Sequence, residues 1–223
     1  MNIEIKRTLD GSDTLFVPEM NEHYHSMFGA VQESRHVFID QGLMAVDVGT
    51  DPVSVFEVGF GTGLNALLTA LTAKAQRREV RYTSIELHPL ETNVLKRLNY
   101  NSCLMEPDAG EEFVKIHETP WEKASQVNPY FTLTKFKADV RLFDPSGLAF
   151  DVVYFDAFAP EVQPDLWTVT IFEKMYQLIL HGGLLITYSC KGIVKRNLRE
   201  AGFSIKRLQG PPGKWEMLRA QKK

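Results

Sequence analysis

Residues 55–65 read Val-Phe-Glu-Val-Gly-Phe-Gly-Thr-Gly-Leu-Asn, an apolar run with one acid that leads into three alternating glycines. The run predicts a buried strand, and the periodic apolar residues after the glycines predict an amphipathic helix. Gly59, Gly61 and Gly63 lack a Cβ atom, so the backbone can turn tightly and lie against a ligand. The stretch therefore predicts a ligand-binding loop between a strand and a helix, although a tight turn without a ligand also fits.

The acids near this loop bear on which ligand it takes. A dinucleotide fingerprint needs Gly or Ala at position 64, where the chain has Leu64. Glu57, two residues before the first glycine, would repel a phosphate and attract an ammonium group. S-adenosylmethionine has an ammonium group and no phosphate, so we predict it as the cofactor, with Glu57 at its amine. Glu86 closes the next apolar strand and is placed to accept hydrogen bonds from ribose hydroxyls, a feature that NAD sites share.

Length and composition fit one principal domain. The chain has 223 residues and 44% hydrophobic content, enough for one substantial core. We expect residues 1–45 to form an N-terminal extension, a hairpin plus a helix, packed on a domain of residues 46–223. The first ten residues do not read as a signal peptide and no long apolar span is present, so we expect a soluble, cytoplasmic protein.

Other kinds of catalytic site find little support. Cys103 and Cys190 form no C-x-x-C pair, and the six histidines show no metal-binding spacing, so we predict no metal site. No serine lies in a G-x-S-x-G context, which argues against a hydrolase. Residues 24–26 could fold over the mouth of the cofactor site, although an N-cap role for Ser26 is the plainer interpretation.

Charge is unevenly distributed along the chain. Residues 191–223 hold ten Lys or Arg and two Glu, a formal +8, so residues 1–190 carry −11 of the total of −3. A basic C-terminal segment on an otherwise acidic protein suggests a surface that binds a polyanion, with Lys195, Arg196 and Arg199 as candidate contacts. A solvated helix face with a charged tail is an equal alternative.

Strand and helix patterns alternate along most of the chain, which predicts an α/β fold with a mostly parallel sheet covered on both faces. A hairpin after the last helix adds an antiparallel closing strand. Together with the acid and glycine loop, this is the architecture of a class I, Rossmann-like methyltransferase. The predicted strands are 3–8, 15–17, 53–58, 80–87, 131–137, 151–155, 184–188, 203–208 and 215–220; the predicted helices are 29–42, 64–75, 90–100, 166–180 and 191–201; residues 118–130 are predicted to be irregular.

Acids occur at the ends of four successive parallel strands. Glu57, Glu86, Asp139 and Asp156 should share one crevice, because ligands of open α/β sheets lie across the carboxyl ends of the strands. We expect Asp139 near the adenine amino group and Asp156 towards the methyl acceptor. An amine acceptor is mostly protonated at neutral pH, so Asp156 would orient it and accept its proton as the catalytic residue. Phe158 is a candidate to stack on a planar base, although ordinary packing also explains it.

Further segments resemble one family. They are His25-Ser26, Gly29-Ala30, Glu33-Ser34, His36-Val37-Phe38, the 57–65 loop, Asp156-Ala157-Phe158-Ala159-Pro160, Pro164-Asp165-Leu166-Trp167, Arg196, Ala201-Gly202-Phe203 and Lys214-Trp215-Glu216-Met217-Leu218. From about residue 20 onwards the chain resembles the methyltransferase part of the bifunctional MnmC family. Trp215 stands where that resemblance leads us to expect a basic residue.

The resemblance implies N-methylation of 5-aminomethyl-2-thiouridine at the tRNA wobble position, which gives 5-methylaminomethyl-2-thiouridine. Members of that family also carry an FAD-dependent oxidase, and a second glycine-rich loop is absent from this sequence. The resemblance thus implies a stand-alone methyltransferase with tRNA as partner and a separate protein supplying the aminomethyl intermediate. Two alternatives stay open: a class I methyltransferase for a small amine or a protein, and a non-catalytic SAM-binding module that interacts with RNA.

Overall fold

Strand β4, Val53–Val58, lies in the middle of the main sheet. Five of its six residues are buried, because the strand is paired on both sides and covered on both faces. Its neighbours, β5 (Val80–Glu86) and β8 (Phe150–Phe155), run parallel to it. The computed structural model describes residues 3–47, 49–144 and 147–223, and all three of these strands lie within those ranges.

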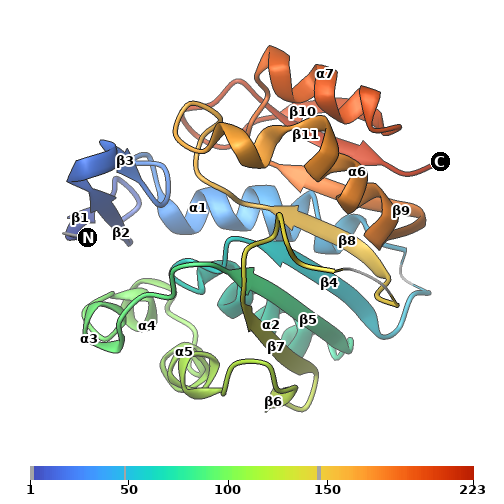
Figure 1. The fold of residues 1–223 in the computed structure, drawn as a ribbon. Helices are drawn as coiled ribbons and strands as arrows, with labels where there is room; N and C mark the ends of the chain where they lie inside the picture. Colours follow the sequence, from blue (N-terminus) through green and yellow to red (C-terminus); the bar gives the residue numbers. More distant parts are fainter. Residues whose placement is uncertain (1–2, 48, 145–146) are drawn as a thin grey trace.

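Five further strands complete the sheet. β7 (Phe131–Lys137) pairs in parallel with β5, and β9 (Ile179–Thr187) pairs in parallel with β8. Antiparallel strands stand at both edges: β6 (Ser125–Asn128) beside β7, and β11 (Glu216–Gln221) between β9 and β10 (Ser204–Gln209). The order is β10-β11-β9-β8-β4-β5-β7-β6 (Figure 1). The predicted parallel sheet with an antiparallel closing hairpin is confirmed.

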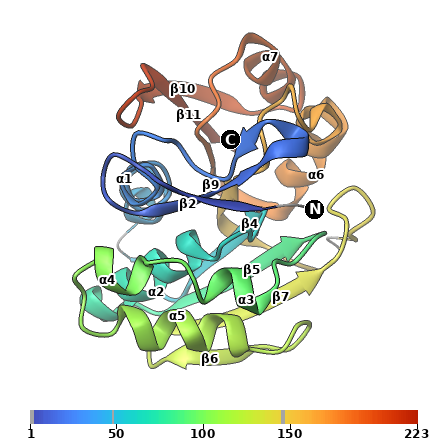
Figure 2. The same ribbon diagram turned by 90° about the vertical axis from the view of Figure 1, so that its left-hand side faces the viewer.

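Helices cover both faces of this sheet (Figures 1 and 2). One face carries α2 (Leu64–Gln76), α5 (Ala109–Glu118) and α1 (Ala30–Ser34), which continues into a π-helical segment, Arg35–Asp40. The other face carries α6 (Val169–Leu178) and α7 (Gly192–Glu200). Each face therefore has its own apolar core.

Alternation along β4 assigns its side chains to these cores. Val53 and Val55 belong to the core under α2, whereas Phe56 and Val58 belong to the core under α6. Successive side chains of a strand point to opposite faces, so Glu57 points to the α2 face with Val55. The acid that precedes the glycines thus lies beneath the helix that follows them.

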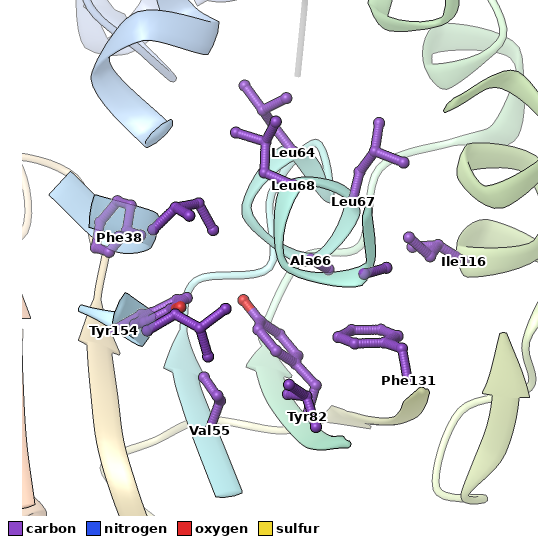
Figure 3. Packing of buried hydrophobic residues seen from close by; sticks show 14 of the residues in the cluster. Phe38, Val55, Leu64, Ala66, Leu67, Leu68, Tyr82, Ile116, Phe131 and Tyr154 are labelled. Carbon is purple, nitrogen blue, oxygen red and sulfur yellow. The ribbon is translucent and has the colours of Figure 1, made fainter. Parts of the chain in front are cut away.

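The core under α2 is rich in aromatic rings (Figure 3). Tyr82 lies 5.9 Å from Tyr154 and 5.4 Å from Phe131 between ring centroids, and Phe38 lies 5.1 Å from Tyr154. Ala66 lies on the side of α2 that faces these rings, Leu64, Leu67 and Leu68 point to the other side, and the hydroxyl of Tyr82 points towards the helix. This packing fixes the height of α2 over the strands and hence the position of the loop at its start.

The N-terminal segment forms a small antiparallel sheet of β1 (Glu4–Arg7), β2 (Asp13–Val17) and β3 (Glu22–His23). The predicted hairpin of strands 3–8 and 15–17 is confirmed, and a 3-10 turn, Pro18–Met20, leads to β3. Figure 2 shows this sheet in front of the main one. How the chain divides into domains at residue 45 stays a prediction.

The predicted helix 90–100 is wrong. Its residues form two single turns, α3 (Thr92–Leu95) and α4 (Tyr100–Cys103), with Asn99 between them. The Asn99 amide donates to the Gly11 carbonyl at 2.9 Å and accepts from the Asp13 backbone nitrogen at 2.8 Å. Bonding to the N-terminal sheet thus competes with a continuous helix.

Elsewhere the boundaries differ in detail. Residues 118–130, predicted to be irregular, include the edge strand β6. The predicted helix 166–180 is a 3-10 turn, Pro164–Trp167, followed by α6, and a further 3-10 turn spans Leu43–Ala45.

The part of the chain described by the structure contains no helix long and apolar enough to cross a membrane.

Candidate functional site

A cavity of about 770 Å³ opens at the carboxyl ends of β4, β5 and β8. Its size is that of a small-molecule site. The wall comes from both halves of the chain, since the N-terminal segment and the β10–β11 turn close it opposite the strand ends. The wall residues used below are Tyr24, His25, Glu33, Gly59, Gly61, Asn65, Glu86, Asp139, Arg141, Asp156, Phe158, Tyr188, Lys191 and Lys214.

The glycine loop turns sharply between β4 and α2. Gly59, Gly61 and Gly63 all have positive φ angles, of 91°, 48° and 73°, which favour glycine. A Cβ atom on Gly59 would lie 2.6 Å from the carbonyl oxygen of Asp156. Gly59 and Gly61 line the cavity, whereas Gly63 faces the His117 ring behind it. Two of the three predicted glycines are therefore directly accessible to a ligand in the cavity.

Glu86 and Asp139 both line the cavity, as predicted from their places at strand ends. The carboxylate of Glu86 accepts hydrogen bonds from the backbone nitrogens of Gly61 at 3.0 Å and His88 at 2.8 Å. Asp139 is paired with Arg141, whose Nη2 lies 2.6 Å from its carboxylate. That guanidinium lowers the pKa of Asp139. Both acids therefore have fixed orientations, and each oxygen of Glu86 keeps a lone pair to spare.

Glu57 does not line the cavity. Its side chain is fully buried one layer behind the wall, where it accepts hydrogen bonds from Asn65 Nδ2 at 3.0 Å and Ser84 Oγ at 2.7 Å. Burial raises the pKa of Glu57 to about 8, although both hydrogen bonds act in the opposite direction. Direct contact with a ligand ammonium group, as predicted above, is not part of this arrangement.

Asp156 lines the cavity at the end of β8. Its carboxylate accepts a hydrogen bond from Asn65 Nδ2 at 2.8 Å. Burial raises the pKa of Asp156 to about 7; the Asn65 hydrogen bond and the Lys214 charge lower it, and the Glu33 charge raises it. This carboxyl group can therefore take up and release a proton near neutral pH.

The wall opposite the strands joins distant parts of the chain. Glu33 of α1 accepts hydrogen bonds from Lys214 Nζ and, at 2.7 Å, from the Ser26 backbone nitrogen. The Lys214 ammonium also lies 4.0 Å from the ring centroid of Tyr188, a favourable cation–π distance. Ser26 Oγ accepts from the Phe28 nitrogen, whereas the first-turn nitrogens of α1 donate to Ser12 Oγ and Asp10 Oδ2, so the N-cap interpretation of Ser26 is wrong.

Aromatic groups complete this wall. The rings of Tyr24 and Phe158 meet edge to face with centroids 4.9 Å apart, so Phe158 is packed on one side while it lines the cavity. His25, the next residue along the chain after Tyr24, is half-buried in the cavity wall, and desolvation lowers its pKa to about 4, which keeps its imidazole neutral. Residues 24–26 line the cavity, which is compatible with the alternative that they fold over its mouth.

The basic residues of α7 lie elsewhere. Arg196 and Arg199 are exposed and Lys195 is half-buried, and none of the three lines the cavity. Asn65, Glu33 and Lys214, by contrast, are site residues that the predictions do not assign. The resemblance includes all three among its motifs, but only the fold brings them to one cavity.

Comparison with known proteins assigns the family. The family model described as S-adenosyl-L-methionine-dependent methyltransferase matches residues 111–223. The chain belongs to this methyltransferase family. The predicted fold class and the predicted cofactor are thereby confirmed. The crystal structure of MNMC2 from Aquifex aeolicus has the same fold as this methyltransferase, with a TM-score of 0.79 and 24% sequence identity. The match covers 100% of this chain and 71% of that one.

Curated relatives of the methyltransferase match nearly the whole chain. Two are the tRNA 5-methylaminomethyl-2-thiouridine biosynthesis bifunctional proteins MnmC of Cupriavidus metallidurans and Burkholderia multivorans. The first is 31% identical and the second 32%, over 94% and 92% of this chain. The match covers 32% and 33% of the relatives, so this chain spans about a third of their length.

Charges in the cavity fit the family's cofactor. Each Lys or Arg among the described wall residues is paired with an acid: Arg141 with Asp139, Lys191 with Glu161 and Lys214 with Glu33. The cations that could bind a phosphate in this cavity are therefore already paired with carboxylates. A cofactor with an ammonium and a sulfonium but no phosphate suits this methyltransferase better.

Proposed function

We propose that this methyltransferase methylates the amine nitrogen of 5-aminomethyl-(2-thio)uridine at the wobble position of tRNA. The product is 5-methylaminomethyl-(2-thio)uridine. The observation that carries the proposal is the carboxyl group of Asp156, which lines the cavity with a pKa near 7. The names of the curated relatives support tRNA as the substrate.

The chemistry requires an unprotonated amine. When bound, S-adenosyl-L-methionine supplies a methyl group on a positively charged sulfur. The amine lone pair forms the N–C bond while the C–S bond breaks, and the sulfur leaves as a neutral thioether. A protonated amine has no lone pair, so Asp156 is proposed to orient the amine and accept its proton, which then passes to water.

The same proposal assigns the rest of the cavity. Gly59 and Gly61 would lie against the cofactor, Glu86 would accept from its ribose hydroxyls and Asp139 would lie near its adenine amino group. Phe158 would contact the uracil ring of the acceptor. Glu57 and Gly63 would shape the loop from behind the wall.

The proposed tRNA contacts lie outside the cavity. Lys195, Arg196 and Arg199 of α7 would bind phosphates of the tRNA backbone. Residues 1–45 would serve as an extension of the methyltransferase domain, residues 46–223, and help to wall the acceptor site through Tyr24 and Glu33. A separate enzyme would supply the aminomethyl-uridine intermediate.

One experiment tests the activity. The purified protein is incubated with isotope-labelled S-adenosylmethionine and tRNA that carries the aminomethyl intermediate, and the nucleosides are analysed by mass spectrometry. We expect the label in the methylaminomethyl nucleoside, and none with tRNA already methylated there. Label only on a small amine or a protein would favour another methyltransferase; cofactor binding without any transfer would favour a non-catalytic RNA-binding module.

A further inference from the structure

One amide links the two buried acids of the site. Asn65 lies in the first turn of α2 and is 3% exposed. Its Nδ2 atom lies 3.0 Å from Glu57 Oε1 and 2.8 Å from Asp156 Oδ2. A side-chain amide has two N–H donors, so Asn65 can give one hydrogen to each carboxyl group.

The far end of this link is itself fixed. β4 and β5 pair in parallel with Glu57 opposite Ser84, and the Ser84 hydroxyl donates to Glu57 Oε2 at 2.7 Å. Both oxygens of Glu57 are therefore engaged. The chain of hydrogen bonds runs from β5 through β4 and α2 to Asp156 at the cavity.

The surroundings determine which way the Asn65 amide faces. If its oxygen and nitrogen were exchanged, Oδ1 would face an oxygen of each carboxyl group, and both hydrogen bonds that Nδ2 donates would be lost. Oδ1 therefore points away from both acids and has no hydrogen-bond partner in the structure as described. A group with both donors committed in this way cannot rotate without losing two hydrogen bonds.

We propose that Asn65 is a positioning residue, through which Glu57 holds the carboxyl group of Asp156 in the orientation that receives the acceptor amine. Glu57 acts on this methyltransferase through Asn65 rather than as a ligand of the cofactor. The inference rests on the proposed role of Asp156 and adds the two residues that support it. Because a hydrogen bond donated to a carboxylate favours its charged form, Asn65 also keeps Asp156 available as a base.

The charges around Asp156 make the effect of Asn65 measurable. Glu33 of α1 opposes ionisation of Asp156, whereas Lys214 of the β10–β11 turn favours it, and Asp156 in turn opposes ionisation of Glu57 of β4. Tyr188, which follows β9, is kept protonated by burial and by nearby acids, Asp156 first among them. None of these groups is altered when Asn65 is replaced, so a change in the Asp156 pKa reports the lost hydrogen bond.

The first test compares Asn65→Ala with Asn128→Ala. Asn128 is a matched control, since it is also buried and its Nδ2 donates to a carboxylate, that of Glu112, away from the cavity. We expect Asn65→Ala to lower kcat about 10- to 100-fold, to leave cofactor affinity unchanged and to raise the apparent pKa of the acid limb. Asn128→Ala should affect thermal stability but not this pKa.

The second test uses Glu57 and does not depend on Asn65 variants folding. Gln keeps an acceptor for Asn65, so Glu57→Gln should recover most of the rate that Glu57→Ala loses. Both variants should bind S-adenosylmethionine with wild-type affinity in calorimetry. A loss of affinity in Glu57→Gln, with kcat unchanged, would overturn the inference and make Glu57 a ligand of the cofactor.

A third measurement separates this inference from the proposed reaction. ¹³C NMR of labelled carboxyl groups follows the titration of Asp156 in the wild type and in Asn65→Ala without any substrate. A higher pKa in the variant supports the positioning role even if the tRNA reaction is not observed. An unchanged pKa together with unchanged kcat would refute it.

Discussion

Opposing influences hold the carboxyl group of Asp156 close to half-ionisation at neutral pH. Burial raises its pKa to about 7, and Glu33 adds to this, while Asn65 and Lys214 lower it. A general base is most effective when its pKa lies near the working pH. Removal of one of these neighbours should therefore change the pH dependence of the reaction before it changes the fold.

Asp156→Asn is the most direct test of this residue. Asn keeps the shape and one acceptor oxygen but cannot take up the proton, so we expect turnover to fall about a hundredfold. Activity should partly return at higher pH, where more of the amine is unprotonated, and cofactor affinity should be unchanged. Wild-type turnover at neutral pH would show that another group handles the proton.

The same burial makes stability depend on pH. A carboxyl group whose pKa is raised by folding stabilises the protein below its unfolded pKa, and this contribution is lost as pH rises through the folded value. Glu57 and Asp156 have folded pKa values of about 8 and about 7. His25 and His117, lowered to about 4, contribute the opposite trend only at lower pH.

Between about pH 7 and 8 these histidines are mostly neutral in both states. Lys135, whose pKa is lowered by burial to about 8, opposes the trend mainly above this interval, so the acids should dominate. We expect the free energy of unfolding in urea to fall across this interval for the wild type. The fall should be smaller for Glu57→Gln, which carries no titratable group there. Equal slopes for the two proteins would mean that Glu57 is already ionised at pH 7.

Single residues could be predicted from the sequence only in part. The position of Asp156 at a strand end follows from local patterns, because parallel strands end at the same edge of a sheet. The distance from Asn65 to Glu57 does not, since it depends on how α2 lies across β4 and β8. A polar residue in the first turn of a helix is too common a pattern to indicate that it joins two acids.

At the scale of elements, prediction succeeds where burial is uniform. Strand 53–58 and helix 64–75 match β4 and α2, because a strand covered on both faces is apolar almost throughout. Helix 90–100 fails although its apolar spacing is helical. Its Asn99 is bonded to Gly11 and Asp13, residues that local periodicity cannot connect to it.

The glycine loop offers a test of an element. Gly59→Ala would strain a positive φ and also place a Cβ 2.6 Å from the Asp156 carbonyl oxygen. Gly182→Ala is the matched control, with a φ of 81° and open space around it. We expect about 1 kcal/mol of destabilisation for the control. Gly59→Ala should cost more and weaken cofactor binding, and equal effects of the two would mean that the loop is not packed as described.

At the scale of the whole molecule, residues 191–223 carry a formal net charge of +8, whereas residues 1–190 carry −11. If α7 binds tRNA, reversing Lys195, Arg196 and Arg199 to Glu should weaken tRNA binding and flatten its salt dependence, because fewer counterions are released. Cofactor affinity should not change. Reversing the exposed Lys96, Arg97 and Lys123 is the control of equal charge. Similar effects of both triple variants would indicate a non-specific charge effect.

The position of β11 between β9 and β10 also determines the order in which the last strands can pair during translation. β10 is made first but pairs only with β11 among the described strands, so it cannot join the sheet until the later strand emerges. Lys214 follows Glu33 by 181 residues, on the order of ten to forty seconds of translation. Until then Glu33 lacks its ion-pair partner Lys214 and the wall opposite Asp156 is incomplete, so a nascent chain cannot yet enclose an acceptor.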